Sequence, residues 1–223
     1  MCFSATASFV AGVALATVGI ATLRLTSRPS EIPLAAIPLL FGIQQIIEGL
    51  IWLSFRQASP LPNLPFTFVY SLFSNVLWPI YVPFAIRLLE TVLWRRKALL
   101  VLQIAGIAVG LYLFCFLVRF SVTSRVLGQH IVYGESLPFV GVVMTFYLSA
   151  TCVSSMLASH WMIRMFGVVS LATFIAAYAI NVTTLASVWC FFAAVLSFFV
   201  YAYLLGGNRA NGMRQSSTNT SLS

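Results

Sequence analysis

Seven long apolar segments, separated by short polar stretches, dominate the chain. They cover residues 5–25, 33–55, 66–92, 98–119, 137–159, 162–182 and 185–205. Each is close to or longer than the about 20 residues that a helix needs to cross about 30 Å of hydrocarbon. Backbone polar groups in lipid must bond within the segment, and these runs are too long and uniformly apolar for barrel strands. The pattern therefore predicts an all-α integral membrane bundle of seven transmembrane helices.

The polar stretches divide the chain further. Residues 206–223 are rich in Ser, Asn and Thr and contain no apolar run, which is typical of a disordered tail. We therefore predict a transmembrane domain over residues 1–205 and a disordered polar tail over 206–223. The longest connection between segments, about residues 120–136, has β-branched residues next to His130 and predicts a short extended cap.

Composition supports the membrane prediction. Of the 223 residues, 61% are hydrophobic and only 7% are charged, whereas a soluble domain carries about 25% charged residues. The net charge of +8 comes from short basic clusters between the apolar segments. Such clusters orient membrane helices and face anionic lipid, so the predicted partner is the lipid bilayer and no nucleic acid.

The basic residues also predict an orientation. If the N-terminus lies outside, nine Lys and Arg residues fall in inner loops and the tail, and three fall in outer loops. Because positive residues are enriched on the cytoplasmic side, the N-terminus is predicted outside and the C-terminus in the cytoplasm. The inner residues are Arg24, Arg28, Arg87, Arg95, Arg96, Lys97, Arg164, Arg209 and Arg214, and the outer ones are Arg56, Arg119 and Arg125.

Glu48 is an acidic residue inside the second apolar segment. Phe41, Gln45, Glu48 and Trp52 share one helix face, and Gln44 lies at its edge. A carboxylate in hydrocarbon is costly and faces a partner or a cavity. Two interpretations stay open: a ligand, proton or metal site, or a protonated Glu48 that holds helices together. In either case the two glutamines can donate amide hydrogens to Glu48.

Three more residues are predicted near the outer end of the bundle. At about 1.5 Å per residue, Glu48 and Cys190 both lie about 8 Å below the outer surface. Cys2 begins the first segment there, and removal of Met1 would leave a free amine beside its thiol, which can bind a soft metal or attack a carbonyl. His130 lies in the outer loop. Their plain structural interpretations are packing for Cys190, an inert start for Cys2 and a solvated loop residue for His130.

Other patterns predict contacts between helices. Gly106 and Gly110 form a GxxxG motif that permits close helix approach. At the inner boundary, Glu90 lies three residues after Arg87 and shortly before Arg95, Arg96 and Lys97, which predicts ion pairing with these basic residues. A line of small residues in the fifth segment predicts a packing face; its members are Gly141, Thr145, Ser149, Cys152 and Ser159.

Missing motifs exclude several classes of membrane protein. The sequence contains no HExxH, no GxSxG and no aspartate, which argues against zincin-type proteases and Ser-His-Asp hydrolases. It has no helical pair of histidines, which argues against ceramidase-like and adiponectin-receptor-like hydrolases. The last segment has no lysine that could form a retinal Schiff base.

Four stretches resemble a known family. They are the opening MCFSATASF, the sequence PLLFGIQQIIEG over residues 38–49, the pair Trp78-Pro79 and the sequence WCFFAA over residues 189–194. They resemble small bacterial membrane proteins of unknown function that begin Met-Cys-Phe-Ser, and the resemblance covers nearly the whole chain except the tail. It implies a multi-span protein, which we expect in the bacterial inner membrane, and assigns no chemistry.

Three functions fit these observations. The first is a receptor or sensor that binds a small ligand or a metal ion in a polar pocket of the outer half. The second is a membrane-embedded enzyme, with Cys2 as nucleophile or a metal-bound water, and Glu48 as acid or base. The third is a transporter of protons or a small solute. The predicted pocket residues are Cys2, Gln44, Gln45, Glu48, His130 and Cys190.

Overall fold

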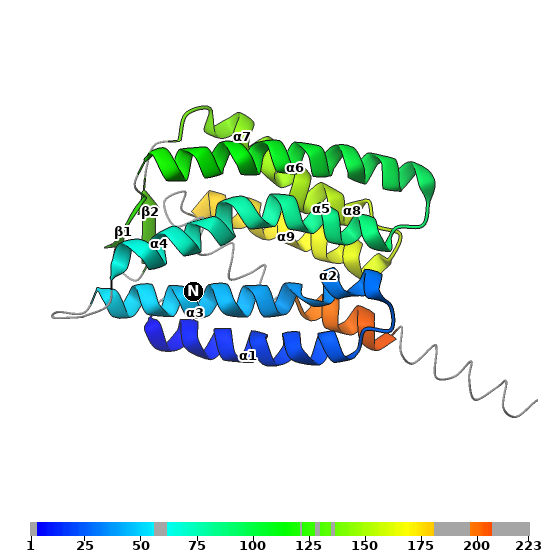
Figure 1. Ribbon diagram of the computed structural model, residues 1–223, viewed down its shortest axis with the longest axis horizontal. Helices are drawn as coiled ribbons and strands as arrows, with labels where there is room; N and C mark the ends of the chain where they lie inside the picture. The colour runs from blue at the N-terminus through cyan, green and yellow to red at the C-terminus, as the bar shows by residue number, and fades with distance from the viewer. Residues whose placement is uncertain are drawn as a thin grey trace, which may run out of the picture.

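The computed structural model describes residues 4–55, 62–120, 122–127, 130–134, 137–180 and 197–206. Its long helices lie side by side and run in alternating directions (Figure 1). The elements in chain order are α1 (Ala5–Arg24), the 3₁₀-helix η1 (Pro29–Glu31), α2 (Ile32–Ala35), α3 (Ile37–Ser54), α4 (Asn63–Ser71), the π-helix η2 (Leu72–Leu77), α5 (Trp78–Leu89), α6 (Leu93–Arg119), β1 (Thr123–Leu127), β2 (His130–Gly134), α7 (Val140–Leu148), the π-helix η3 (Ser149–Val153), α8 (Ser154–Met156) and α9 (Trp161–Ile180).

Hydrophobic length accounts for most of these helices. Among the described residues, five helical stretches are long and apolar enough to cross a membrane: Ala5–Arg24, Pro29–Ser54, Asn63–Leu89, Leu93–Arg119 and Trp161–Ala179. Val140–Met156 forms a shorter apolar helix. Of the seventh predicted segment, the structure describes residues 197–206, which are helical from residue 198. The all-α prediction is therefore confirmed, with one small two-stranded sheet added. The predicted tail lies outside the described residues, apart from its first residue.

The helix termini gather at two opposite ends of the bundle (Figure 1). We call one the hairpin end (residues 4–8, 51–55, 62–67, 119–120, 122–127 and 130–134) and the other the basic end (residues 20–34, 86–98 and 156–164). Among the described residues, seven Lys and Arg side chains lie at the basic end and two at the hairpin end. The seven are Arg24, Arg28, Arg87, Arg95, Arg96, Lys97 and Arg164, and the two are Arg119 and Arg125.

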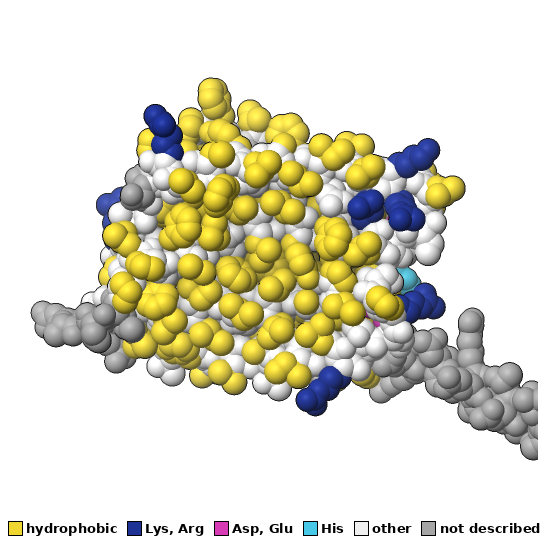
Figure 2. Space-filling model, viewed as in Figure 1, with side chains coloured by type: hydrophobic (Ala, Val, Ile, Leu, Met, Phe, Trp, Pro, Cys, Tyr) yellow, Lys and Arg dark blue, Asp and Glu magenta, His cyan; other side chains and the backbone are white. Residues whose placement is uncertain are grey.

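The side chains between these ends are mostly apolar on the surface that Figure 2 shows. Hydrophobic side chains cover the middle of this face, and Lys and Arg side chains lie around its borders. Many large apolar side chains are exposed, for example Val10 at 65% and Val101 at 65%. A broad apolar surface with charged borders is the pattern expected of a bundle that faces lipid.

Helices α1 and α3 form an extensive helix pair. A Cβ atom on Gly19 would lie 2.6 Å from the Cα atom of Leu39, so only glycine permits this approach of the two backbones. The hydroxyl of Thr22, which is fully buried, donates to the carbonyl oxygen of Ala35 at 2.7 Å. This bond ties the end of α1 to α2, which leads into α3.

Helices α5 and α6 are close because of a proline and a glycine. Pro83 lies inside α5 and has no N–H, so the Pro79 carbonyl lacks the amide that normally donates to it. A Cβ on Gly106 would overlap this oxygen and lie 2.8 Å from its carbonyl carbon. The Gly106 Cα–H therefore points at the freed carbonyl, a weak contact that contributes about 0.5–1 kcal/mol. A Cβ on Gly110 would lie 2.9 Å from the Ile80 side chain, so the predicted GxxxG contact is confirmed.

In the described part of the chain, two π-helical turns interrupt the α-helices. The hydroxyl of Tyr147, just before η3, donates to the carbonyl oxygen of Ser74 in η2 at 2.5 Å. Within η3, the Thr151 hydroxyl donates back to the Tyr147 carbonyl at 2.9 Å. A π-turn takes backbone carbonyls out of the regular pattern of α-helical hydrogen bonds. Here side-chain hydroxyls donate to carbonyls in or next to these turns.

The predicted packing face of the fifth segment is only half formed. Cys152 is buried, but Thr145 is exposed and a Cβ on Gly141 would meet no atom within 4 Å. The prediction is therefore wrong for the part nearest the hairpin end. Small residues there pack against no neighbouring helix among the described residues.

Candidate functional site

Helix α3 places three polar side chains inside the bundle. Gln44, Gln45 and Glu48 are each 0% exposed, although the helix around them is strongly apolar. Residues 44 and 48 are one turn apart, and residue 45 is adjacent, so the three lie on one side of the helix. Glu48 therefore lies in the interior of the bundle, as the cost of a lipid-facing carboxylate predicts.

Trp78 fixes the Gln44 side chain. Its indole Nε1 donates to the Gln44 Oε1 atom at 2.8 Å, and its ring stacks on Phe41 with centroids 3.9 Å apart. Within the described part of the chain, the Gln44 Nε2 atom makes no hydrogen bond. The prediction that Gln44 donates to Glu48 is therefore wrong. Trp78 orients the Gln44 carboxamide through its Oε1 atom, and the buried Nε2 atom of Gln44 stays available as a donor.

A layer of aromatic and aliphatic residues covers this site on the side of the hairpin end. Ile51 lies one turn, about 5 Å, beyond Glu48 along α3 and is fully buried. It belongs to a core cluster with Tyr70 and with Ile131 of β2, which is 1% exposed. Tyr133 of β2 stacks on Tyr70, with centroids 4.5 Å apart. The hairpin therefore places Ile131 and Tyr133 in the layer that lies one turn from Glu48 toward the hairpin end.

A chain of hydrogen bonds fastens the hairpin to the helices. The hydroxyls of Thr67 and Ser124 lie 2.7 Å apart, and Ser124 donates to Asn63 Oδ1 at 2.9 Å. Asn63 Nδ2 in turn donates to the Ser54 hydroxyl at 2.8 Å. These bonds join β1, the start of α4 and the end of α3. The strands pair antiparallel, with Arg125 opposite Val132, so the predicted extended cap is confirmed.

The other predicted site residues are only partly described. Cys2 and Cys190 lie outside the described residues, so their predicted approach to Glu48 stays a prediction. The His130 backbone pairs with Leu127 at the tip of the hairpin, and its side chain is outside the described part. Of the six predicted residues, the structure brings together Gln44, Gln45 and Glu48.

The described residues hold no cluster of three or more His, Cys, Asp or Glu side chains that could bind a metal ion. A metal site at Glu48 would therefore need ligands from residues such as Cys2 or Cys190. The chemistry that the described side chains offer is hydrogen bonding and charge: an amide donor from Gln44 and the carboxyl group of Glu48.

The sequence contained a signal for this site that our predictions did not use. Polar or amphipathic residues recur every three or four positions along the helical stretch Asn63–Leu89, which is the spacing of one helix face. All of them except Asn63 are buried; they are Asn63, Thr67, Ser71, Ser74 and Trp78. This buried polar face supports both the hairpin and Gln44.

A second buried carboxylate lies at the basic end. Glu90 is 5% exposed and accepts hydrogen bonds from the Ser159 amide at 2.8 Å, the Ser159 hydroxyl at 2.7 Å and the Val92 amide at 2.9 Å. Burial alone raises the pKa of the Glu90 carboxyl, but these bonds and the charge of Arg95 lower it below its ordinary value. Arg87 instead donates to Gln103 at 2.7 Å. Arg87 is therefore not the partner of Glu90, whereas Arg95, another of the predicted basic residues, acts on the Glu90 carboxyl through its charge. Glu90 links two inter-helix connections.

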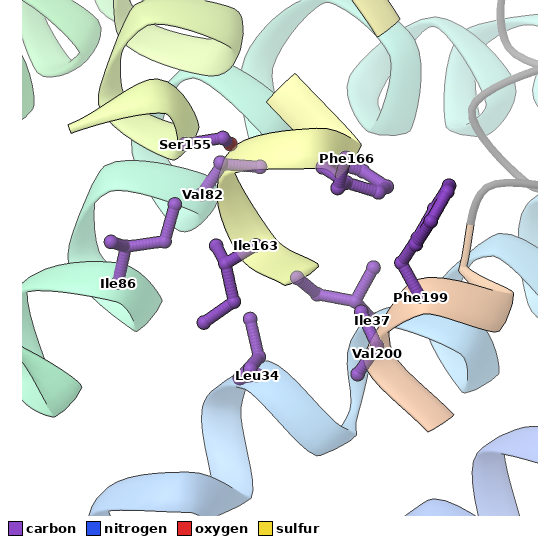
Figure 3. Close-up of a pocket in the computed structure, with 9 residues that line it drawn as sticks. All are labelled: Leu34, Ile37, Val82, Ile86, Ser155, Ile163, Phe166, Phe199 and Val200. Atoms are coloured by element: carbon purple, nitrogen blue, oxygen red, sulfur yellow. The ribbon is translucent and has the colours of Figure 1, made fainter. Parts of the chain in front are cut away.

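A small apolar void lies between α2, α5, α9 and the last described helix (Figure 3). Its volume is about 10 Å³, and its lining includes Leu34, Ile163 and Val200. The one hydroxyl in its lining, from Ser155, already donates to the Thr151 carbonyl at 2.8 Å. A void of this size and chemistry does not hold a ligand, and water needs polar partners to enter.

The comparisons with known proteins place the chain in a family. Residues 1–216 match the model of a family of unknown function, DUF6629, and the chain belongs to that family. No curated protein matches the chain. No solved structure matches it. The chemistry of the chain must therefore be inferred from its own residues.

Proposed function

We propose that this protein is an integral membrane receptor or sensor with seven transmembrane segments, whose hairpin end faces outward. Five long apolar helices, the shorter Val140–Met156 helix and the helix that ends at residue 206 support seven segments. The seven-to-two excess of Lys and Arg at the basic end supports a cytoplasmic location of that end. The membrane in this proposal is the bacterial inner membrane.

Reporter fusions test the topology. A periplasm-active phosphatase and a cytoplasm-active fluorescent protein are each fused after Gly206 and inserted between β1 and β2. We expect fluorescence from the fusion after Gly206 and phosphatase activity from the hairpin insertion. Both positions on the same side of the membrane would contradict the seven-segment proposal.

The ligand site in this proposal is the polar cluster of Gln44, Gln45 and Glu48. The observation that carries it is complete burial of all three side chains, a carboxyl group among them, on one side of a strongly apolar helix. Polar and ionisable groups within membrane segments rarely face lipid. Those buried inside the bundle commonly mark binding sites or ion pathways. The Gln44 amide donor and the Glu48 carboxyl group suit a small ligand that carries both an acceptor and a cationic or donor group.

The enzyme and transporter alternatives depend on other parts of the chain. A nucleophile at Cys2, or a metal held by Cys2 and Cys190, would involve residues outside the described ones. The described residues favour binding because Trp78, stacked on Phe41, holds the Gln44 carboxamide in one orientation. An oriented donor next to a carboxyl group is what selective binding requires.

Thermal stability measures this binding directly. Wild-type protein in lipid nanodiscs is heated with Zn²⁺, with free amino acids and with small primary amines, each tested separately. A ligand at about 100 times its Kd stabilises by about 2.7 kcal/mol, so the melting temperature rises. We expect at least one probe to stabilise the wild type but not Glu48→Gln.

The matched control is Glu31→Gln, which removes a carboxylate at the basic end. Glu31 accepts from the amides of Ser27 at 2.8 Å and Arg28 at 3.2 Å, far along the bundle from Glu48. This variant should respond to the probe like the wild type. If the stabilising probe acts equally on wild type and Glu48→Gln, or if no probe stabilises the wild type, the binding proposal is wrong and Glu48 serves helix packing.

A further inference from the structure

A groove of about 360 Å³ runs along the outside of the bundle between α6 and α7. Ala105, Ala108 and Tyr112 of α6 form one wall, and Val142 and Phe146 of α7 form the other, with Phe139 at the rim. The groove exists because two alanines of α6 face the larger side chains of α7. Phe139 has a left-handed backbone, with φ at 54°, where the chain turns into α7.

The lining of this groove is almost purely apolar. Its one polar side-chain atom is the Tyr112 hydroxyl, which donates to the carbonyl oxygen of Pro138 at 3.3 Å. Phe139 is 79% exposed and Val142 is 58% exposed, so the groove opens to the surroundings. In a membrane those surroundings are hydrocarbon, and an open apolar groove of this kind fits a flexible hydrocarbon chain.

A cationic side chain continues the same face of α6. Ala105, Ala108 and Tyr112 are spaced by three and four residues, and the next positions at this spacing are Cys115 and Arg119. Arg119 is exposed and lies seven residues, about 10 Å, beyond Tyr112 toward the hairpin end. An arginine in this position can form paired hydrogen bonds with a phosphate.

We propose that this groove binds one acyl chain of an anionic phospholipid, whose phosphate contacts Arg119. The inference rests on membrane embedding and is independent of the Glu48 site. The amphipathic order along α6 matches that of a lipid: apolar alanines, then the Tyr112 hydroxyl, then the Arg119 charge. With the hairpin end outward, the lipid belongs to the outer leaflet.

A second copy of the chain fits this groove less well. Two copies in one membrane share their orientation, so a two-fold contact through the groove would pair identical surfaces. Both Arg119 side chains would then lie at the same level close to the contact, where like charges repel. A phospholipid instead supplies the complementary negative charge.

Native mass spectrometry tests the proposal. The protein is released from nanodiscs that contain equal amounts of phosphatidylglycerol and phosphatidylcholine with the same acyl chains. We expect wild-type protein to retain phosphatidylglycerol in preference to phosphatidylcholine. Ala108→Trp fills the groove and should lower the retained fraction of both lipids at least about fivefold. Arg119→Gln should remove the preference between the lipids, because hydrogen bonds to a charged group are lost.

Leu111→Trp is the control, because Leu111 is exposed on α6 but does not line the groove. It adds the same ring to the same helix and should retain lipid like the wild type. Equal loss in Ala108→Trp and Leu111→Trp, or no preference for phosphatidylglycerol in the wild type, would overturn the proposal. A wild-type dimer that Ala108→Trp dissociates would also overturn it, in favour of a second copy.

The thiol of Cys115 gives an independent measurement. It is exposed and unpaired and lies on the same face of α6 between the groove and Arg119. A bound lipid should slow its alkylation, read by peptide mass, in phosphatidylglycerol nanodiscs relative to phosphatidylcholine nanodiscs. Arg119→Gln should make the two rates equal. Equal rates in the wild type would contradict lipid binding at this face.

Discussion

Gly106 provides a sharp test of how α5 and α6 pack. Gly106→Ala places a methyl group on the Pro79 carbonyl oxygen, 2.8 Å from the carbonyl carbon and 3.1 Å from the Ala150 Cβ. An oxygen of the backbone cannot rotate away as a flexible side chain can. The two helices must therefore separate. Because Pro83 has no N–H, α5 cannot redirect this carbonyl into an ordinary helical hydrogen bond.

The expected loss follows from three contributions. Overpacking of a tight contact costs about 1–3 kcal/mol, and the lost Cα–H contact adds about 0.5–1 kcal/mol. The better helix propensity of alanine offsets about 0.8–1 kcal/mol of this. We therefore expect Gly106→Ala to lower the free energy of unfolding by about 2 kcal/mol.

Gly141→Ala is the matched control. Gly141 lies in α7, and a Cβ there would meet no atom within 4 Å. This variant should be as stable as the wild type or more stable by up to about 1 kcal/mol. Both variants are unfolded in detergent by increasing amounts of SDS, and circular dichroism monitors the loss of helix. If Gly106→Ala unfolds like Gly141→Ala, the close approach of α6 to the Pro79 carbonyl is wrong.

Other predictions concern the two ends of the bundle. Ile131→Ala should destabilise the hairpin by about 2–4 kcal/mol because Ile131 is 1% exposed, whereas Leu127→Ala, on the opposite face of the hairpin and 57% exposed, should change little; protease cleavage between the strands measures both. Trp78→Phe removes the hydrogen bond to Gln44 and should cost about 1–3 kcal/mol in SDS unfolding, because a buried acceptor loses its donor. The Glu90 pKa is lower in the folded protein, so its contribution is complete above the ordinary value of 4.5 and is lost as pH falls through the lower folded pKa; Glu90→Gln should flatten the stability profile at acid pH.

Properties that depend on one segment could be predicted from the sequence. Hydrophobic length predicted where the helices lie, because any 20-residue apolar run must satisfy its own backbone. The interior position of Glu48 followed from the cost of exposing a carboxyl group to lipid. The GxxxG contact of Gly106 was also predictable, although its partner on α5 was not.

Properties that depend on which helices are neighbours could not be predicted. Glu90 bonds to Ser159, which is 69 residues away, while the sequence suggested only its local basic neighbours, Arg87 first among them. Gln44 is held by Trp78 through a bond across 34 residues, while the sequence suggested Glu48 on the same helix. In both cases the nearest residue of suitable charge or polarity was not the partner, because helix order in a bundle is set by packing surfaces that one sequence does not reveal.

In the proposed receptor, the hairpin described above would affect the rates of ligand binding more than the affinity. Access to Glu48 from the hairpin end requires the Tyr70–Tyr133 stack and the buried Ile131 to separate from α3 and α4. In that proposal, such an opening would precede binding and limit how often a ligand can enter, whatever its final affinity. A ligand that enters this way would bind slowly and also leave slowly, so the protein would average its signal over many short fluctuations in ligand concentration.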